Sequence, residues 1–315
     1  KSRAGGFAGG FFAIYIPPLE VDYDARNAAM MADSYDLPLP PQIDWPHAVT
    51  VTMAQINILL ELERRQALSI SRSVSDIRSS MAAGSIAAIM HIEGAEAIDS
   101  ELDLLHLLHA AGLRSIGPVW SRPTIFGHGV PFAFPAGPDI GPGLTEAGLR
   151  LIGACDELGI LIDLSHMNEA GFRDVARHSH NPLVATHSNA HAICPHARNL
   201  TDDQLYAIRD SGGMVGLNFA TAFLRPDGKM LPEVPLEIML RHLDHLIGIL
   251  GEDHVGLGDV GVLAEEVGEL AQQRLGVLLL RGERVEPLLH LLVEAADGAA
   301  EAARHQLGVW LGGAA

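Results

Sequence analysis

Short apolar runs alternate with amphipathic segments along most of this chain, and this alternation constrains the fold more than any other feature. Continuous apolar runs, each ending at a polar residue or glycine, predict strands at 5–16, 85–92, 113–120, 160–164, 182–186, 214–217 and 254–258. Apolar residues at three- and four-residue spacing predict helices at 49–82, 102–111, 145–158, 168–179, 201–210 and 236–250. Thr145 and Thr201 are the predicted N-caps, and Gly159 is a predicted C-cap.

The repeated unit is a strand, a polar terminus, a loop and a helix. Continuous apolar strands joined by helices are typical of parallel sheets covered on both faces. At least five such units follow one another, which favours an α/β fold of the (β/α)8 TIM-like barrel type over a doubly wound sheet. A glycine-rich phosphate-binding motif would favour the doubly wound sheet, but the sequence after the strand at 85–92, Gly94-Ala95-Glu96-Ala97, is not one.

Composition excludes several classes of function. The formal net charge is −18, from 21 Lys and Arg against 39 Asp and Glu, so we expect neither a nucleic-acid partner nor an anionic membrane surface. No apolar run is long enough for a membrane-spanning helix. With Cys155 and Cys194 as its 2 cysteines, the chain is no disulfide scaffold. We expect a cytoplasmic, bacterial protein; because the sequence opens at Lys1 rather than Met, an earlier secretion signal stays open.

Polar side chains stand where the predicted strands end. These residues are Glu93, Trp120, His166, His187 and Asn218. Barrel enzymes carry their reacting groups at the carboxyl ends of the strands. One carboxylate and two imidazoles that converge there are ligands that suit zinc, and three protein ligands with one open position are typical of catalytic zinc.

The other histidines are weaker candidates. We expect His178, His180, His191 and His196 to face solvent, because they fall in loops or on helix surfaces. His242 and Asp244 lie two apart within a helical pattern and face different sides, so they are not a ligand pair.

Several linked motifs, in order between residues 5 and 258, resemble the renal or membrane dipeptidases, peptidase family M19. The motifs are Ile92-Glu93-Gly94, Ile162-Asp163-Leu164-Ser165-His166, Thr186-His187-Ser188-Asn189-Ala190, His196-Ala197-Arg198-Asn199-Leu200-Thr201-Asp202-Asp203, Gly212-Gly213-Met214-Val215-Gly216-Leu217-Asn218-Phe219, His242-Leu243-Asp244-His245 and Asp253-His254-Val255-Gly256-Leu257-Gly258. The resemblance implies a zinc-dependent barrel that hydrolyses dipeptides, usually as a homodimer.

The resemblance also implies roles for individual residues. Glu93 matches the carboxylate that bridges two zinc ions, and His166 and His187 match the histidine ligands of the second zinc. Arg198 matches the arginine that holds the carboxylate of the substrate, a task suited to a bidentate guanidinium. Asn218 is a further candidate for substrate contact. Inside the strand at 160–164, Asp163 either orients a metal ligand or pairs with neighbouring backbone.

The chain departs from the family pattern in three places. The family's first strand carries an H-x-D pair for the first zinc, and the sequence given begins downstream of it. The first zinc site therefore keeps only the bridging Glu93, whereas the second is complete. The family's S-D-F-D-G motif is absent after Gly258, and Asp259 is the candidate to replace its proton-transfer Asp. Trp120 stands where many members have a substrate-polarising histidine, for which His128 is a weak substitute.

Composition changes after Gly258, since residues 259–315 contain no Phe, Tyr, Ile or Lys. We therefore predict a barrel domain at 1–258, lacking its first strand, and a divergent helical segment at 259–315, and interpret the chain as an incomplete copy of a dipeptidase. Three functions remain open: a zinc dipeptidase, a non-catalytic barrel that binds a peptide-like ligand or partner, and a barrel hydrolase of another amide or a lactone. Chelator sensitivity separates the first from the second, and substrate preference separates the first from the third.

Overall fold

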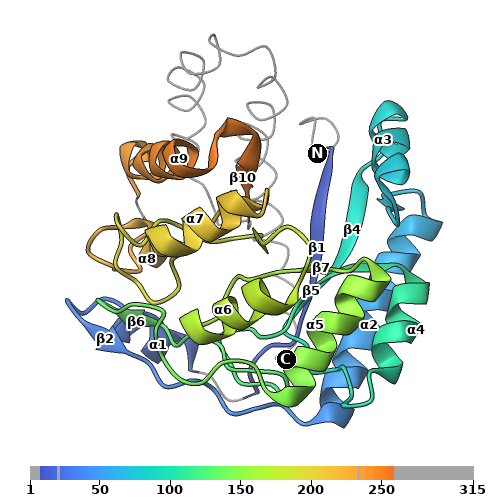
Figure 1. The fold of residues 1–315 in the computed structure, drawn as a ribbon, viewed down its shortest axis with the longest axis horizontal. Coiled ribbons are helices and arrows are strands. Elements are labelled where there is room, and N and C mark those ends of the chain that lie inside the picture. The colour runs from blue at the N-terminus through green and yellow to red at the C-terminus, as the bar shows by residue number, and fades with distance from the viewer. Residues whose placement is uncertain (1–7, 20–21, 233, 259–315) are drawn as a thin grey trace, which may run out of the picture.

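A computed structural model describes residues 8–19, 22–232 and 234–258 of the chain (Figure 1). Two sheets of parallel strands run through its centre. The first has the order β1-β4-β5-β7 and the second the order β10-β9-β8. Their strands are β1 (Gly9–Tyr15), β4 (Ala87–Glu93), β5 (Leu113–Gly117), β7 (Leu161–Ile162), β8 (Val184–Ala185), β9 (Met214–Leu217) and β10 (Val255–Leu257).

One parallel bridge, between Asp163 and Val184, joins the two sheets at β7 and β8. The backbone N–H of Leu164 donates to the carbonyl of Val184 at 2.8 Å and completes this junction. The parallel strands therefore follow one another as β1-β4-β5-β7-β8-β9-β10. The parallel α/β organisation predicted from the alternation of apolar runs and helices is confirmed, and the carboxyl ends of β4, β7, β8 and β9 lie along one edge.

Helices connect successive strands and cover the sheet. Figure 1 shows α2, α4 and α5 together on one side, and α7 and α9 beside β10 on the other. The helices are α1 (Tyr23–Ala29), α2 (Trp45–Arg64), α3 (Val74–Ala82), α4 (Asp103–Ala111), α5 (Glu146–Leu158), α6 (Glu169–His178), α7 (Asp202–Asp210), α8 (Thr221–Leu224) and α9 (Leu236–Leu250).

The predicted caps are confirmed. The side chain of Thr145 accepts a hydrogen bond from the backbone of Gly148 at the start of α5. Thr201 forms a capping box with Gln204 at the start of α7, and this satisfies two backbone donors at once. Gly159 ends α5 in the left-handed region at φ 65°, where a side chain would be disfavoured.

The single helix predicted at 49–82 is wrong. The segment contains two helices, α2 and α3, with β3 (Ser69–Ile70) between them. Ser69 lies opposite Ala87 of β4, and its backbone N–H donates to the carbonyl of Ile86. This pairing with a distant strand overrides the local helical spacing, and α3 then starts afresh at its N-cap, Ser73.

The sequence also gave no indication of a small antiparallel pair, β2 (Tyr35–Asp36) and β6 (Ala133–Phe134). Two residues per strand are too few for a periodic pattern to show. The short helices α1 and α8 and the 3-10 turn η1 (Glu252–His254) are likewise too short for a helical pattern to show in the sequence.

The main core lies between the sheet and the helices, with fully buried Met90, Ile116, Leu151, Phe172 and Leu246 among its residues. Each helix within the described ranges is too short or too polar to cross a bilayer. Asp259 and the predicted segment at 259–315 lie outside the described residues.

Candidate metal centre

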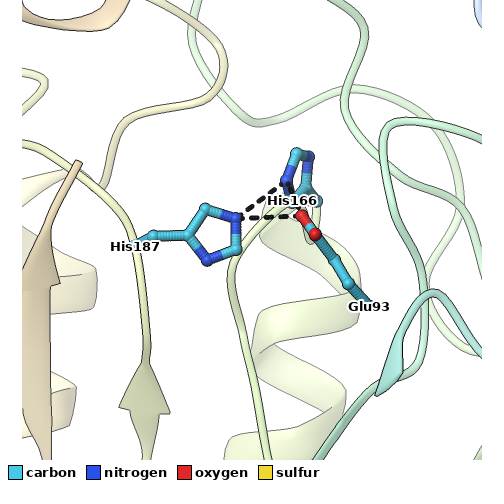
Figure 2. Close-up of side chains that lie close together, drawn as sticks. All are labelled: Glu93, His166 and His187. Atoms are coloured by element: carbon cyan, nitrogen blue, oxygen red, sulfur yellow. Dashed lines mark hydrogen bonds and ion pairs between the residues drawn. The ribbon is translucent and has the colours of Figure 1, made fainter. Parts of the chain in front are cut away.

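Three side chains converge at the carboxyl edge of the sheet: Glu93, His166 and His187. Nε2 of His166 lies 3.0 Å from Oε1 of Glu93, and Nε2 of His187 lies 3.1 Å from the same oxygen. The two Nε2 atoms are 3.0 Å apart. Figure 2 shows the carboxylate and both imidazoles pointing toward one another from three separate segments. The convergence that the strand ends predict is therefore present.

Local backbone structure explains how these side chains meet. Glu93 is the last residue of β4. His187 follows the end of β8 by two residues, and its backbone N–H donates to Oγ of Ser165. His166 lies in a tight turn after β7 with φ 67°, in the left-handed region. A non-glycine residue held there costs of order 1–3 kcal/mol, a strain that is common at functional sites.

The three atoms fit a single divalent cation. Two ligands that are each about 2.0–2.1 Å from a zinc ion at tetrahedral angles lie about 3.3 Å apart. The observed separations of 3.0–3.1 Å are close to that value. One carboxylate and two imidazoles are also a donor set that zinc accepts. The side chains are largely buried, with 18% of Glu93 exposed, so a cation there would be shielded from bulk water while still reachable.

The pKa values of the three converging side chains are shifted in different directions. Burial opposes ionisation of Glu93, but hydrogen bonds and charge from His166 and His187 outweigh it and hold the pKa of the carboxyl well below its usual value. Burial and the nearby charge of Arg198 lower the pKa of His166 to about 3, so this imidazole is neutral. Burial acts the same way on His187, but Glu93 and Asp163 outweigh it and raise the pKa of His187.

The far nitrogen of His166 faces two polar side chains. Its Nδ1 lies 2.9 Å from Oγ of Ser121 and 3.0 Å from Nε of Arg198. Arg198 is almost fully buried, and its other nitrogens donate to Oγ of Ser188 and to the carbonyl of His187, both at 3.0 Å. The guanidinium therefore lies directly beside both histidines of the site.

Asn218 borders the same region. Its Nδ2 points at the carbonyl of His187 at 3.4 Å, and its Oδ1 accepts from the backbone of Ala220 at 2.6 Å. His128 is partly buried in a loop, and the next residue, Gly129, forms an isolated β-bridge with Met167. Within the described ranges, His128 makes no hydrogen bond to the three converging side chains.

Trp120 is 9% exposed, and its ring centroid lies 5.6 Å from that of His166. Tyr15 and Phe132 contact the same indole at 5.2 and 5.8 Å. An aromatic surface therefore stands beside the site where a polar side chain would be expected from the family pattern.

The expectation that His196 faces solvent is wrong. Its ring is fully buried, packs against Phe223 at 4.6 Å between centroids, and accepts a hydrogen bond at Nδ1 from the backbone of Arg198. Burial and the charge of Arg198 lower its pKa to about 3. The aromatic residues around it come from distant segments, so the sequence near His196 carries no sign of burial.

Sequence reasoning assigned no role to Ser121 or Thr186, although both contact a converging histidine. Thr186 lies directly before His187 in the motif Thr186-His187-Ser188-Asn189-Ala190, and this position is the sequence feature that could have indicated its contact with the histidine. Asp163 accepts hydrogen bonds from backbone N–H groups, which is one of the two roles left open for it, and from the hydroxyl of Thr186, next to His187.

The fold and the site together define a class: an α/β protein of the metallo-hydrolase barrel type with a carboxylate and two histidines at the carboxyl edge of its sheet. The sequence model of the membrane dipeptidases, peptidase family M19, matches residues 1–262. This chain belongs to that family.

Similar proteins agree with this assignment. A metallo peptidase from Rhodobacter sphaeroides, solved with a phosphinate mimic of the dipeptide L-Ala-D-Ala, is 52% identical with a TM-score of 0.83, over 94% of this chain and 87% of that one. An uncharacterised protein from the pqqA 5′ region of Klebsiella pneumoniae is 50% identical over 71% of this chain and 84% of its own length. Another, from the PQQ-III 3′ region of Acinetobacter calcoaceticus, is 42% identical over 78% of this chain and 77% of its own.

Proposed function

We propose that this chain is a metal-dependent dipeptidase that uses zinc. The observation that carries the proposal is the triangle of Glu93 Oε1, His166 Nε2 and His187 Nε2, whose sides are 3.0–3.1 Å, in a chain of the M19 family. Such a triangle has the spacing of a ligand set, and it lies where barrel enzymes carry out their chemistry.

Hydrolysis adds the oxygen of water to the scissile carbonyl carbon, breaks the C–N bond and delivers a proton to the leaving amine. A bound divalent cation supplies polarisation of the carbonyl and lowers the pKa of a water molecule. Glu93, His166 and His187 hold that cation, and the burial of their side chains keeps the site at low dielectric. Asp259 is the candidate for proton transfer; sequence position alone supports it, because it lies outside the described residues.

Arg198 is the candidate for the substrate carboxylate. Its Nε lies 3.0 Å from His166 Nδ1. Only the imidazole ring of His166 therefore separates this fixed positive charge from the proposed position of the cation. A buried guanidinium binds a carboxylate strongly because its donors match the two oxygens. Asn218 and His128, on the loops after β9 and β5, are the further candidates for substrate contact.

The relative from Rhodobacter sphaeroides, which binds a mimic of L-Ala-D-Ala, supports a dipeptide as substrate and suggests L-Ala-D-Ala as the first one to assay. The family resemblance supports a homodimer with two zinc ions per subunit. In the described residues the ligands of one ion are together, so we propose at least one zinc per chain. Two buried free thiols, Cys155 and Cys194, fit a reducing compartment such as the cytoplasm.

The test is hydrolysis of a dipeptide panel by the purified full chain. We expect turnover of dipeptides that a chelator abolishes and added zinc restores. Glu93→Gln removes one ligand charge and should lower kcat/KM at least about 100-fold. A folded chain that binds zinc and L-Ala-D-Ala without turnover would identify a non-catalytic relative instead. Turnover of lactones in preference to dipeptides would identify a different barrel hydrolase.

A further inference from the structure

A short chain of hydrogen bonds runs from the interior of the sheet to His187. Oγ1 of Thr186 donates to Oδ2 of Asp163 at 2.6 Å and lies 2.7 Å from Nδ1 of His187. Oδ1 of Asp163 accepts from the backbone of Ser165 at 3.0 Å and of Thr186 at 2.8 Å. Asp163 is 1% exposed, so this carboxylate is fixed from several directions inside the protein.

The direction of these hydrogen bonds determines where the imidazole of His187 carries its proton. A threonine hydroxyl has one hydrogen, and here it goes to a carboxylate, which can only accept. The hydroxyl must therefore accept from His187, so Nδ1 carries a hydrogen. The other nitrogen, Nε2, faces Glu93 Oε1 at 3.1 Å and is then the one that can offer a lone pair to a cation.

We propose that Thr186 and Asp163 are positioning residues that fix His187 in the Nδ1–H form and hold its Nε2 toward the metal. This inference rests on the proposed metal centre and deepens it, because it names the residues that prepare one ligand before a cation arrives. Partners of this kind, which accept a hydrogen bond from the far nitrogen of a metal-binding histidine, raise metal affinity by fixing its tautomer and ring orientation.

His91 extends the same arrangement into the sheet. It lies two residues before Glu93 on β4, so both side chains are on the same face. Its Nδ1 lies 2.9 Å from Oγ of Ser115, and its Nε2 is 3.6 Å from Oδ2 of Asp163. Asp163 therefore lies between two imidazoles, with Oδ2 also 3.7 Å from Nδ1 of His187. The His91 imidazole faces this carboxylate from just beyond hydrogen-bond distance.

Three substitutions separate the roles of the hydroxyl and the carboxylate. Thr186→Val keeps the branched shape but removes the hydroxyl, and Thr186→Ser keeps the hydroxyl. Asp163→Asn keeps the acceptor at Oδ1, but an amide NH2 in place of Oδ2 donates to Thr186. The threonine hydroxyl then donates to Nδ1 of His187, which reverses the chain and moves the imidazole hydrogen to Nε2. Thr52→Val, at a buried threonine of α2, is the matched control.

The first measurement is the dissociation constant for zinc alone, by competition with a chromogenic chelator, in the full chain. We expect Thr186→Val to weaken zinc binding about 10- to 100-fold and Asp163→Asn to weaken it at least as much. Thr186→Ser and Thr52→Val should stay within about threefold of wild type. Zinc affinity within about threefold of wild type for Thr186→Val would overturn the inference.

The second measurement is the ¹⁵N chemical shift of the His187 side chain in the zinc-free protein, which reports the nitrogen that carries the hydrogen. We expect Nδ1–H in wild type and in Thr186→Ser, and loss of that preference in Asp163→Asn. An unchanged His187 signature in Asp163→Asn would overturn the inference, whatever its effect on stability. A wild-type chain that binds no zinc would instead refute the metal centre itself, so the two failures are distinguishable.

Discussion

The buried imidazole of His242 makes the stability of this protein dependent on pH. His242 lies on α9, is fully buried, and makes two hydrogen bonds to backbone: Nδ1 accepts from Ala190 at 3.1 Å and Nε2 donates to the carbonyl of Leu224 at 2.9 Å. Protonation would place a second hydrogen on Nδ1, against the N–H of Ala190. Burial, together with the neighbouring charges of His245 and Arg241, lowers its pKa from 6.5 to about 4.

The sign follows from proton uptake. Between pH 6.5 and 4 the unfolded chain binds a proton at this histidine and the folded chain does not, so stability falls as pH falls through that window. From pH 8 to pH 5.5 the loss from this one group is about 1.4 kcal/mol, and it approaches about 3 kcal/mol near pH 4.

The assay is urea unfolding at pH 8 and pH 5.5 for wild type and two variants. His242→Gln keeps a donor for the carbonyl of Leu224 but does not titrate, so its loss of stability between the two pH values should be smaller than that of wild type by about 1.4 kcal/mol. His242→Phe keeps the ring but leaves both backbone groups unpaired, and should cost about 2–4 kcal/mol at pH 8. Equal pH dependence in wild type and His242→Gln would refute the reasoning.

Three further predictions concern other parts of the fold. In the wild type, Nη2 of Arg122 lies 2.5 Å from the buried carboxylate of Glu96. Arg122→Met leaves this carboxylate without its partner and should lower the free energy of unfolding by about 3–5 kcal/mol in a urea titration. Thr201→Ala removes the capping box of α7 and should cost about 1 kcal/mol, with a loss near zero counting against the cap. Arg198→Gln should raise KM for L-Ala-D-Ala about 10- to 100-fold but leave KM for the corresponding dipeptide amide nearly unchanged; an equal rise for both would mean that Arg198 does not read the carboxylate.

The strand-and-helix order of this chain could be predicted from sequence because each unit is local. The apolar runs before Glu93 and Asn218 are long enough to show strand character, and Thr145 and Thr201 precede their helices at the positions that caps require. Failures arose where distant contacts decide the structure. Ser69 belongs to β3 because it pairs with β4, and nothing in its own neighbourhood indicates that partner.

The convergence of Glu93, His166 and His187 was predictable for a related reason. Parallel strands bring their carboxyl ends to one edge, so polar residues that follow successive strands must lie near one another. The surroundings of the cluster follow no such rule. The contact of Arg198 with His166 Nδ1, and the burial of His196 among aromatic rings from other segments, depend on how loops fold back over the edge. Sequence periodicity does not describe loops.

The measurement that tests the central claim most directly is zinc content and hydrolysis of L-Ala-D-Ala, taken together, in the wild-type chain and in Glu93→Gln. If Glu93, His166 and His187 hold the working metal, wild type carries at least one tightly bound zinc and hydrolyses the dipeptide, and Glu93→Gln loses both while staying folded. Full activity in a Glu93→Gln chain that has lost this zinc would contradict the account.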